Sequence, residues 1–227
     1  MFEVDLPGAR VVFTTRLGGG SKGAYASRNL GIETEDDPEV VRANLAETRA
    51  GLGLPEVQLL HQIHGADIRS IDRDTVGSVP LGDGAVVTER NLPVLISGAD
   101  CPAVVIASSE RLVALHCGWR SVAAGIIEAA VERLAGERFS AVIGPGICQD
   151  HFEVGAEVVE QMGAHGPNFT EGRQFDLRGL IRHRLDAAGA ASIHQVERCT
   201  HCEPELFYSF RRDGDPTGRQ AAIAWRI

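Results

Sequence analysis

The chain has 227 residues, which is enough for one large domain with a substantial core or for two small domains. Apolar residues make up 44% and charged residues 23% of the chain, a balance typical of globular proteins. The formal net charge of -9 argues against general affinity for nucleic acid or anionic membranes, although it is compatible with a local basic pocket.

The sequence shows no signal for export or for a membrane span. Residues 1–5 lack a basic region followed by a long apolar one. The longest apolar stretch, 92–108, is too short to cross a bilayer and contains Asp100. The 5 cysteines are odd in number and widely scattered, unlike a secreted disulfide framework. We therefore expect a cytoplasmic protein with reduced thiols.

Runs rich in Val and Ile, bordered by turn-forming residues, predict the strands. In chain order they cover residues 11–15, 57–60, 67–71, 85–88, 93–97, 103–107, 112–116, 140–143, 192–195 and 221–225. Apolar residues at helical spacing predict helices over 38–52, 122–134, 155–162 and 177–188. We expect Ser121 to cap the second helix, and 163–172 to form a loop.

Several expected strands follow one another across short turns such as Gly82-Asp83-Gly84. This order favours an α/β fold, bordering on α+β, with mixed sheets rather than a doubly wound parallel sheet. The chain contains no internal repeat and no low-complexity linker. We therefore expect a single domain over 1–227.

Two imidazoles and a thiol are expected to meet at strand ends. His64, Cys101 and His116 each lie at the end of an apolar run. Three such ligands without a fourth are typical of a catalytic zinc site that keeps one coordination position open. The same thiol and imidazole could instead form a cysteine nucleophile and its base. His61 precedes His64 by three residues, but the local pattern is strand-like, so we expect it to be a bystander.

Charged residues near these positions predict supporting roles. Asp100 lies in an apolar stretch, where a carboxylate is costly to bury without a partner, so we expect it either to orient a ligand or to cap backbone amides in a turn. Arg120 and the helix start at Ser121 together suit an anion such as phosphate. The basic segment 209–219 is expected to be either a solvated turn or a lid that contacts an anion.

The pair Cys199 and Cys202 has the Cys-x-x-Cys spacing. A zinc ribbon needs a second such pair, and the sequence contains none, so a closed structural zinc site is not expected. A redox pair is the remaining functional interpretation, although the usual helical context is missing.

Taken together, these motifs resemble the YfiH-like family, also called laccase-domain or multicopper polyphenol oxidase-like proteins and, more recently, purine nucleoside phosphorylases. The resemblance extends over nearly the whole chain. The motifs that carry it are Phe13-Thr14-Thr15-Arg16, Asn29-Leu30-Gly31, Gln62-Ile63-His64-Gly65, Asp83-Gly84, Ala99-Asp100-Cys101-Pro102, His116-Cys117-Gly118-Trp119-Arg120, Gly144-Pro145-Gly146-Ile147, Cys199-Thr200, 209–214 and Thr217-Gly218-Arg219.

The resemblance implies that His64, Cys101 and His116 bind a catalytic Zn²⁺. It implies phosphorolysis of adenosine, inosine or guanosine to the base and ribose 1-phosphate, cleavage of methylthioadenosine, and deamination of adenosine. It also implies an α/β sandwich similar to that of Cys–His toxins. The residues expected to contact nucleoside or phosphate are Asn29, Gln62, Arg120 and Arg211. We expect a monomer or a small homo-oligomer, with no nucleic-acid or membrane partner.

The chain departs from the family pattern at three positions. Cys117 replaces the usual small residue, and Ser121 replaces a glycine. Leu45 stands where the family has an arginine in the first helix. If that arginine contacts phosphate in relatives, Arg42, Arg49 or another residue must replace it, or phosphorolysis is impaired.

Three other functions compete with the phosphorylase hypothesis. A copper-dependent phenol oxidase needs many paired His-x-His ligands, and none of the 8 histidines forms such a pair. A metal-free hydrolase or amidase, acting for instance on peptidoglycan precursors, would use Cys101 as nucleophile and His116 as base. A zinc-stabilised binding domain is disfavoured by the open coordination position.

Overall fold

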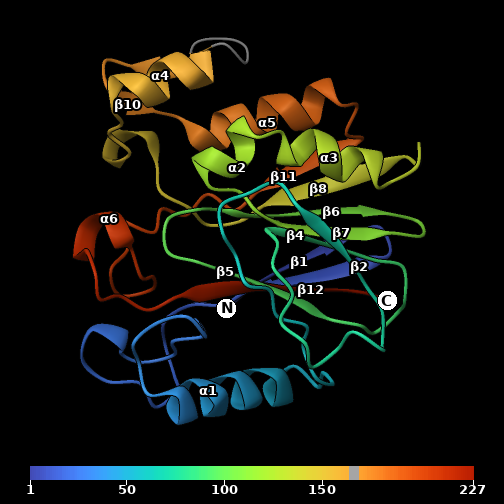
Figure 1. Cartoon of the computed structure of the whole chain (residues 1–227), viewed down its shortest axis with the longest axis vertical. Coiled ribbons are helices and arrows are strands. Elements are labelled where there is room, and N and C mark those ends of the chain that lie inside the picture. Colours follow the sequence, from blue (N-terminus) through green and yellow to red (C-terminus); the bar gives the residue numbers. More distant parts are fainter. Residues whose placement is uncertain (164–168) are drawn as a thin grey trace.

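The computed structural model describes residues 1–163 and 169–227. Two β-sheets lie face to face at its centre, and helices cover their outer faces (Figure 1). The helices α2 (Trp119–Ala123), α3 (Ile126–Glu132) and α5 (Leu177–Ala187) cover the larger sheet, while α1 (Pro38–Gly51) covers the smaller one. The expected α/β sandwich is therefore confirmed.

The smaller sheet is antiparallel throughout and joins both ends of the chain. Its strands, in spatial order, are β1 (Phe2–Leu6), β2 (Ala9–Phe13), β12 (Gln220–Arg226) and β5 (Val94–Gly98). The prediction missed β1 because its charged residues Glu3 and Asp5 alternate with the apolar ones. That alternation is typical of an edge strand with one buried face.

The larger sheet is mixed, as expected. Its strands, in spatial order, are β11 (Ser192–Gln195), β8 (Phe139–Ile143), β6 (Ala103–Ser108), β7 (Leu112–His116), β4 (Gly84–Val87) and β3 (Ile68–Ile71). The pairs β3–β4 and β8–β11 are parallel, and the others are antiparallel. The register of the β6–β7 hairpin places Ala103 opposite His116.

The predicted strand at 57–60 is wrong. Gln58 forms only an isolated parallel bridge to Val94. Its side-chain amide donates to the carbonyls of Leu59 at 2.6 Å and Ser78 at 2.8 Å, which draws the segment away from further pairing with β5. The apolar residues of this segment pack on the core from a loop, which period-2 patterning does not distinguish from a strand.

The central strands supply side chains to two cores because successive residues point to opposite faces. In β6, Val104 and Ile106 pack under the helices, whereas Val105 and Ala107 pack between the two sheets. A third core lies under α1 on the outer face of the smaller sheet. Both faces of β6, β7 and β8 are thus buried, which fixes their register.

The helix predicted over 122–134 begins earlier and is interrupted. Gly118, not Ser121, is the N-cap residue of α2, and Ser121 is buried inside the helix. Gly125 separates α2 from α3 with φ +86, a left-handed conformation that glycine adopts at little cost. The apolar periodicity continues across the break and therefore predicts one helix where two exist.

The C-terminal part contains α4 (Ala156–Gly163), α6 (Phe210–Asp213), and a short hairpin of β9 (Thr170–Glu171) and β10 (Gln174–Phe175). The loop predicted over 163–172 lies partly outside the described residues, and its last part pairs in this hairpin. Two single turns of 3₁₀ helix, η1 (Gly23–Tyr25) and η2 (Gln149–His151), complete the elements. Among the described helices, none is long and apolar enough to cross a membrane.

Candidate functional site

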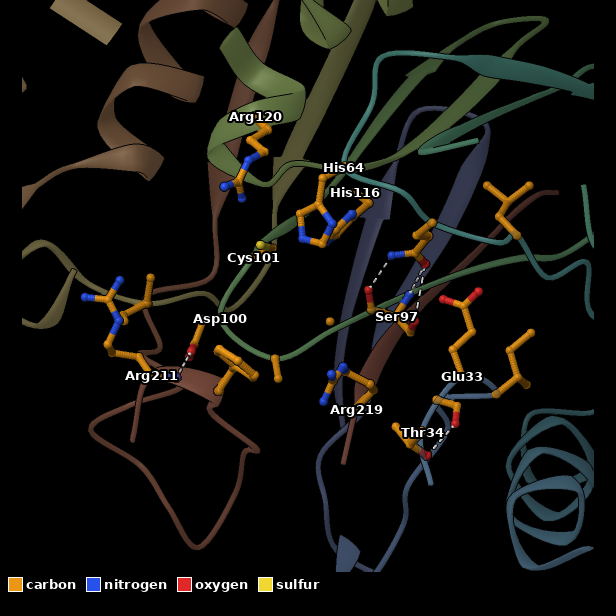
Figure 2. Close-up of a pocket in the computed structure, with 18 of the residues that line it drawn as sticks. Glu33, Thr34, His64, Ser97, Asp100, Cys101, His116, Arg120, Arg211 and Arg219 are labelled. Atoms are coloured by element: carbon orange, nitrogen blue, oxygen red, sulfur yellow. Dashed lines mark hydrogen bonds between the residues drawn. The ribbon is translucent and has the colours of Figure 1, made fainter. Parts of the chain in front are cut away.

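His64, Cys101 and His116 meet at one end of the larger sheet, although they come from three separate segments. The ligand atoms of these three side chains all lie within 4.8 Å of one another. The two imidazoles meet edge to face, with ring centroids 4.7 Å apart, and the Cys101 sulfur lies beside them (Figure 2). The sequence-based grouping of these residues is therefore matched by their positions in space.

The β6–β7 hairpin explains this meeting. Cys101 lies two residues before Ala103, and Ala103 is opposite His116 in the register. The amide of Cys117 donates to the carbonyl of Pro102 at 3.0 Å, which extends the pairing beyond the two strands. Gly118 follows, and a Cβ there would lie 2.9 Å from His64 Cδ2 and 3.2 Å from Cys101 Sγ. Only glycine leaves room for both side chains at this turn.

Asp83 is the central positioning residue, and the prediction missed it as a site residue. It is fully buried, and its Oδ1 lies 2.9 Å from His116 Nδ1. The carboxylate also accepts hydrogen bonds from the consecutive amides of Ile63, His64 and Gly65 at 3.1, 2.9 and 2.6 Å. One carboxylate thus orients both imidazoles: it contacts the ring of His116 and the backbone amide of His64. The backbone of His64 has a φ of +60, in the left-handed region. The sequence signal that could have identified Asp83 is a carboxylate directly before an apolar strand, where burial requires a partner.

These contacts set the ionisation of Asp83. Burial alone would raise the pKa of its carboxyl group. The hydrogen bonds from His116 and from the amides outweigh burial, so the pKa of Asp83 lies below its ordinary value. The group therefore remains a carboxylate, the form that can accept all four hydrogen bonds.

Cys101 and His116 favour the charged forms of each other. Burial would raise the pKa of the Cys101 thiol, but hydrogen bonding and charge from His116 and then His64 lower this pKa to about 6. Burial would lower the pKa of His116, but the hydrogen bonds to Asp83 and Cys101 raise it to about 9. A thiolate beside an imidazolium is therefore the favoured state of this pair near neutral pH.

The group could bind a metal ion. Because His116 Nδ1 is bonded to Asp83, its Nε2 is directed toward the other two side chains. A Cys and two His offer one thiolate and two imidazoles, a donor set that suits zinc or copper.

A cavity of about 480 Å³ opens beside this group. Three arginines line it from different elements: Arg120 from α2, Arg211 from α6, and Arg219 immediately before β12 (Figure 2). Within the described part of the chain, none of the three forms an ion pair. The local basic pocket that composition allowed is therefore present, although Arg219 was expected only as part of a motif.

Backbone carbonyls and rings hold these arginines in place. Arg211 Nη1 donates to the carbonyl of Glu153 at 2.6 Å, and its guanidinium lies 5.2 Å from the centre of the Phe152 ring. Arg219 Nη1 donates to the carbonyls of Thr217 and Gly218 at 2.7 and 2.9 Å. The guanidinium of Arg120 lies over the Trp119 ring at 4.5 Å. Neutral partners leave the positive charges available to an anion.

The carboxylate of Asp100 has its hydrogen-bond partners outside the group of His64, Cys101 and His116, in line with the second interpretation, a turn residue that caps a backbone amide. Its Oδ1 accepts a hydrogen bond from Thr200 Oγ1 at 2.7 Å, and its Oδ2 accepts one from the amide of Arg211 at 2.7 Å. Asp100 therefore ties the C-terminal segment to the β5–β6 loop. Asp83 supplies the carboxylate that the prediction assigned to Asp100.

The predicted substrate contacts divide between the cavity and the interior. Gln62 lines the cavity, but both ends of its amide are bonded to the backbone of Ser97 at 2.8 and 2.9 Å. Asn29 has 0% exposure, and its Oδ1 accepts hydrogen bonds from the amides of Gly31 and Arg219. Asn29 is therefore a positioning residue and not a substrate contact. His61 contacts Glu33 outside the three-residue group, as a bystander would.

Leu45, which stands where the family has an arginine, does not line this cavity. Its side chain packs against the core under α1. The neighbouring Asn44 is buried and hydrogen-bonded to Gly20, Ser21 and Asn29. The cavity takes its positive charge from α2, α6 and the approach to β12 instead.

A mixed α/β sandwich with a Cys–His–His group in the wall of an arginine-lined cavity defines the class of protein. Residues 10–227 match a family model described as multi-copper polyphenol oxidoreductase laccase. The chain therefore belongs to this laccase-domain family, the YfiH-like proteins.

Individual relatives carry a more specific name. The chain is 36% identical over 225 residues to the purine nucleoside phosphorylase of Deinococcus radiodurans, covering 93% of this chain and 87% of that protein. It is 33% identical to the purine nucleoside phosphorylase YfiH of Escherichia coli, covering 97% and 95%.

Solved structures show the same fold. The protein NMB0706 of Neisseria meningitidis superposes with a TM-score of 0.90 at 32% identity, over 99% of this chain and 98% of that one. YlmD of Geobacillus stearothermophilus superposes with a TM-score of 0.90 at 31% identity, over 96% and 92%.

Proposed function

We propose that this protein is a zinc-dependent purine nucleoside phosphorylase. It would convert adenosine, inosine, guanosine or methylthioadenosine and phosphate to the base and the corresponding ribose 1-phosphate, and it would also deaminate adenosine. The observation that carries the proposal is the meeting of His64, Cys101 and His116 beside a cavity with three arginines. The names of the relatives support the nucleoside phosphorylase class.

The donor set fits zinc in its number, chemistry and support. One thiolate and two imidazoles leave a coordination position open, as catalytic zinc sites do. The Asp83 carboxylate fixes the ring orientation of His116, an arrangement that recurs around zinc-binding histidines. When bound at these residues, zinc would supply a Lewis acid in the wall of the cavity.

The arginines would position phosphate for the reaction. In phosphorolysis a phosphate oxygen forms a bond to the anomeric carbon, and the bond between that carbon and the base nitrogen breaks. The electron pair leaves with the base, which takes up a proton. Arg120, Arg211 and Arg219 would hold the phosphate charge and its orientation, which removes much of the entropic cost of bringing the reactants together.

The remaining walls suit a nucleoside. Phe152, Phe210 and Ile32 line the cavity and offer apolar faces against which a purine could pack. Glu33 and Thr34 lie on the opposite side of the cavity from Arg211 and could accept hydrogen bonds from sugar or base (Figure 2). A single catalytic domain over 1–227 fits this proposal, because β12 joins both ends of the chain in one sheet.

The test compares His64→Ala with His61→Ala, a matched control three residues away and outside the group. Adenosine and inosine would be incubated with and without phosphate, and the products identified by mass spectrometry. We expect phosphate-dependent release of adenine and hypoxanthine by the wild type and by His61→Ala. Release by His64→Ala should fall at least about 100-fold, in line with the loss of a metal ligand. Full activity of His64→Ala would overturn the proposal.

A second candidate is a metal-free hydrolase or amidase, which the line of contacts from Asp83 to His116 to Cys101 favours. This order of carboxylate, imidazole and thiol is that of cysteine hydrolases. In that case His64 lacks a role, and a chelator would not reduce activity. A chelator that abolishes turnover would exclude this candidate.

A further inference from the structure

A second cluster of metal-ligating side chains lies in the loops that follow β8 and β11. The sulfur atoms of Cys148, Cys199 and Cys202 all lie within 4.8 Å of one another. The ligand atoms of His151, His201 and Cys202 form a further group within the same limit. Because β8 and β11 are adjacent and parallel, the loops after them leave the same edge of the sheet.

Each loop contributes a pair of potential ligands with two residues between them. Cys148 and His151 form one pair, and Cys199 and Cys202 form the other. In each pair the amide of the second residue hydrogen-bonds to the sulfur of the first. Cys199 Sγ also accepts a hydrogen bond from the amide of Cys148 at 3.3 Å, which joins the two turns. Amides directed at sulfur favour the thiolate, the form that binds metal.

The spacing of the sulfurs fits a tetrahedral metal better than a disulfide. Cys148 Sγ and Cys202 Sγ are 3.8 Å apart. Two thiolates, each about 2.3 Å from a tetrahedral zinc ion, are separated by about 3.8 Å. A disulfide bond is about 2.05 Å long, and it would leave the third sulfur of the cluster unused.

We propose that Cys148, His151, Cys199 and Cys202 form a closed structural zinc site, separate from the group at Cys101. Three cysteines and one histidine are a common ligand set for such sites. The sequence offers only one Cys-x-x-Cys pair, and the structure supplies the second pair as Cys148 and His151.

His151 is a better fourth ligand than His201. The two rings are stacked with centroids 3.9 Å apart, and the ligand atoms of both lie within 4.8 Å of the Cys202 sulfur. His201 is adjacent in sequence to Cys202, which restricts simultaneous binding of one ion by both. His151 is exposed, and in the proposed site its side chain would rotate toward Cys148 and Cys199 to supply the fourth ligand.

The site would hold in place the segment that shapes one wall of the cavity. Thr200, between the two cysteines of its turn, donates its hydroxyl hydrogen to Asp100 at 2.7 Å, and Asp100 accepts from the amide of Arg211. Arg212 donates to the carbonyls of Thr200 and His201 at 2.8 and 2.9 Å. These bonds tie the turn to α6, where the guanidinium of Arg212 also forms an ion pair with Asp213 at 2.8 Å.

The test measures metal content in variants that separate the two sites. Wild type, Cys101→Ser, Cys148→Ser and the double variant would be loaded with zinc, passed through gel filtration, and analysed by mass spectrometry of the metal. His201→Ala serves as the control for His151→Ala. We expect Cys148→Ser and His151→Ala to hold less zinc than wild type and to melt at a lower temperature, while His201→Ala keeps the wild-type values.

The Cys101→Ser background separates this proposal from the proposed function. Zinc that remains in Cys101→Ser and is lost in the double variant supports a second site, whether or not the protein is a phosphorylase. Unchanged zinc content in Cys148→Ser would overturn the proposal. A bond between two of these cysteines in the intact wild-type protein, seen as a loss of two alkylatable thiols, would also overturn it.

If Cys148→Ser does not fold, cobalt loading of Cys101→Ser gives an independent measurement. Thiolate-to-cobalt charge-transfer absorption reports sulfur ligands directly. With Cys101 removed, strong absorption requires the thiolates of the second cluster. Its absence would contradict the proposal.

Discussion

Asp83 connects the two imidazoles of the candidate site through a single buried carboxylate. One oxygen faces His116 Nδ1 and the amide of His64, and the other accepts the amides of Ile63 and Gly65. Both carboxylate oxygens of Asp83 thus accept two hydrogen bonds each in the native structure. Replacement of either oxygen by a donor therefore leaves buried N–H groups facing another N–H.

Asp83→Asn tests this connection. We expect zinc affinity to fall about 10–100-fold, as is typical when the partner of a ligating histidine is changed. The melting temperature should also fall, because one amide or the ring loses its acceptor. Zinc competition against a chelator and thermal unfolding would measure the two effects. Asp67→Asn, at a carboxylate that is 72% exposed and pairs with Arg69 outside this site, is the matched control. Equal zinc affinity in the two variants would contradict the assigned role of Asp83.

The ionisation of Cys101 can be measured by alkylation of metal-stripped protein. We expect the rate at Cys101, followed by peptide mapping, to rise with an inflection near pH 6, because the pKa of this thiol is lowered to about 6. An ordinary thiol titrates at a pH of about 8.5. Zinc should protect Cys101 at every pH tested.

In His116→Gln, burial still raises the pKa of Cys101 and His64 still lowers it, but the larger of the two lowering influences is lost. The inflection should therefore move upward from that of the wild type. Cys117 is buried with a raised pKa and supplies an internal unreactive control. An inflection at a pH of about 8.5 in the metal-stripped wild type would contradict the described pairing of Cys101 with His116.

At the scale of elements, the turn from β7 into α2 brings the site together. His116 ends β7, Gly118 caps α2, and Arg120 in α2 lines the cavity. The turn works only if the backbone at Gly118 approaches His64 and Cys101 closely. A side chain there changes the site before it changes the fold, since the backbone of Gly118 has φ -68, which any residue can adopt.

Gly118→Ala should separate the ligands. The new Cβ would lie 2.9 Å from His64 Cδ2 and 3.2 Å from Cys101 Sγ, so both must move. We expect zinc affinity and turnover each to fall at least about 10-fold. The circular dichroism spectrum should remain that of the wild type, because the fold is retained. Gly51→Ala, where a Cβ meets nothing within 4 Å, should leave both quantities unchanged. Wild-type zinc affinity in Gly118→Ala would contradict the close packing described here.

At the scale of the whole molecule, the sequence predicts those parts of the site that depend on local pattern. Cys101 and His116 flank one hairpin, so their meeting follows from strand ends and a short turn. His64 lies at the end of another apolar run, and the family motifs agree with its place in the group. Asp83 and the cluster of Cys148 with Cys199 and Cys202 depend on pairing between segments 33 to 54 residues apart, which periodicity does not encode.

The same reason explains the errors in the elements. Apolar spacing continues through Gly125, so one helix was predicted although the backbone there is left-handed. The segment at 57–60 has the composition of a strand, but the hydrogen bonds of Gln58 hold it as a loop. In both cases a local pattern was correct about burial and wrong about backbone conformation.

The most direct test of the central claim is phosphorolysis by metal-stripped enzyme to which one metal is returned. Inosine and phosphate would be supplied, and ribose 1-phosphate followed by phosphorus NMR, for the wild type and for Cys101→Ser. We predict that ribose 1-phosphate forms with zinc in the wild type and does not form without metal or in Cys101→Ser. Equal formation of ribose 1-phosphate without metal would contradict the account. So would an activity that appears only with copper and consumes oxygen when a phenol is supplied.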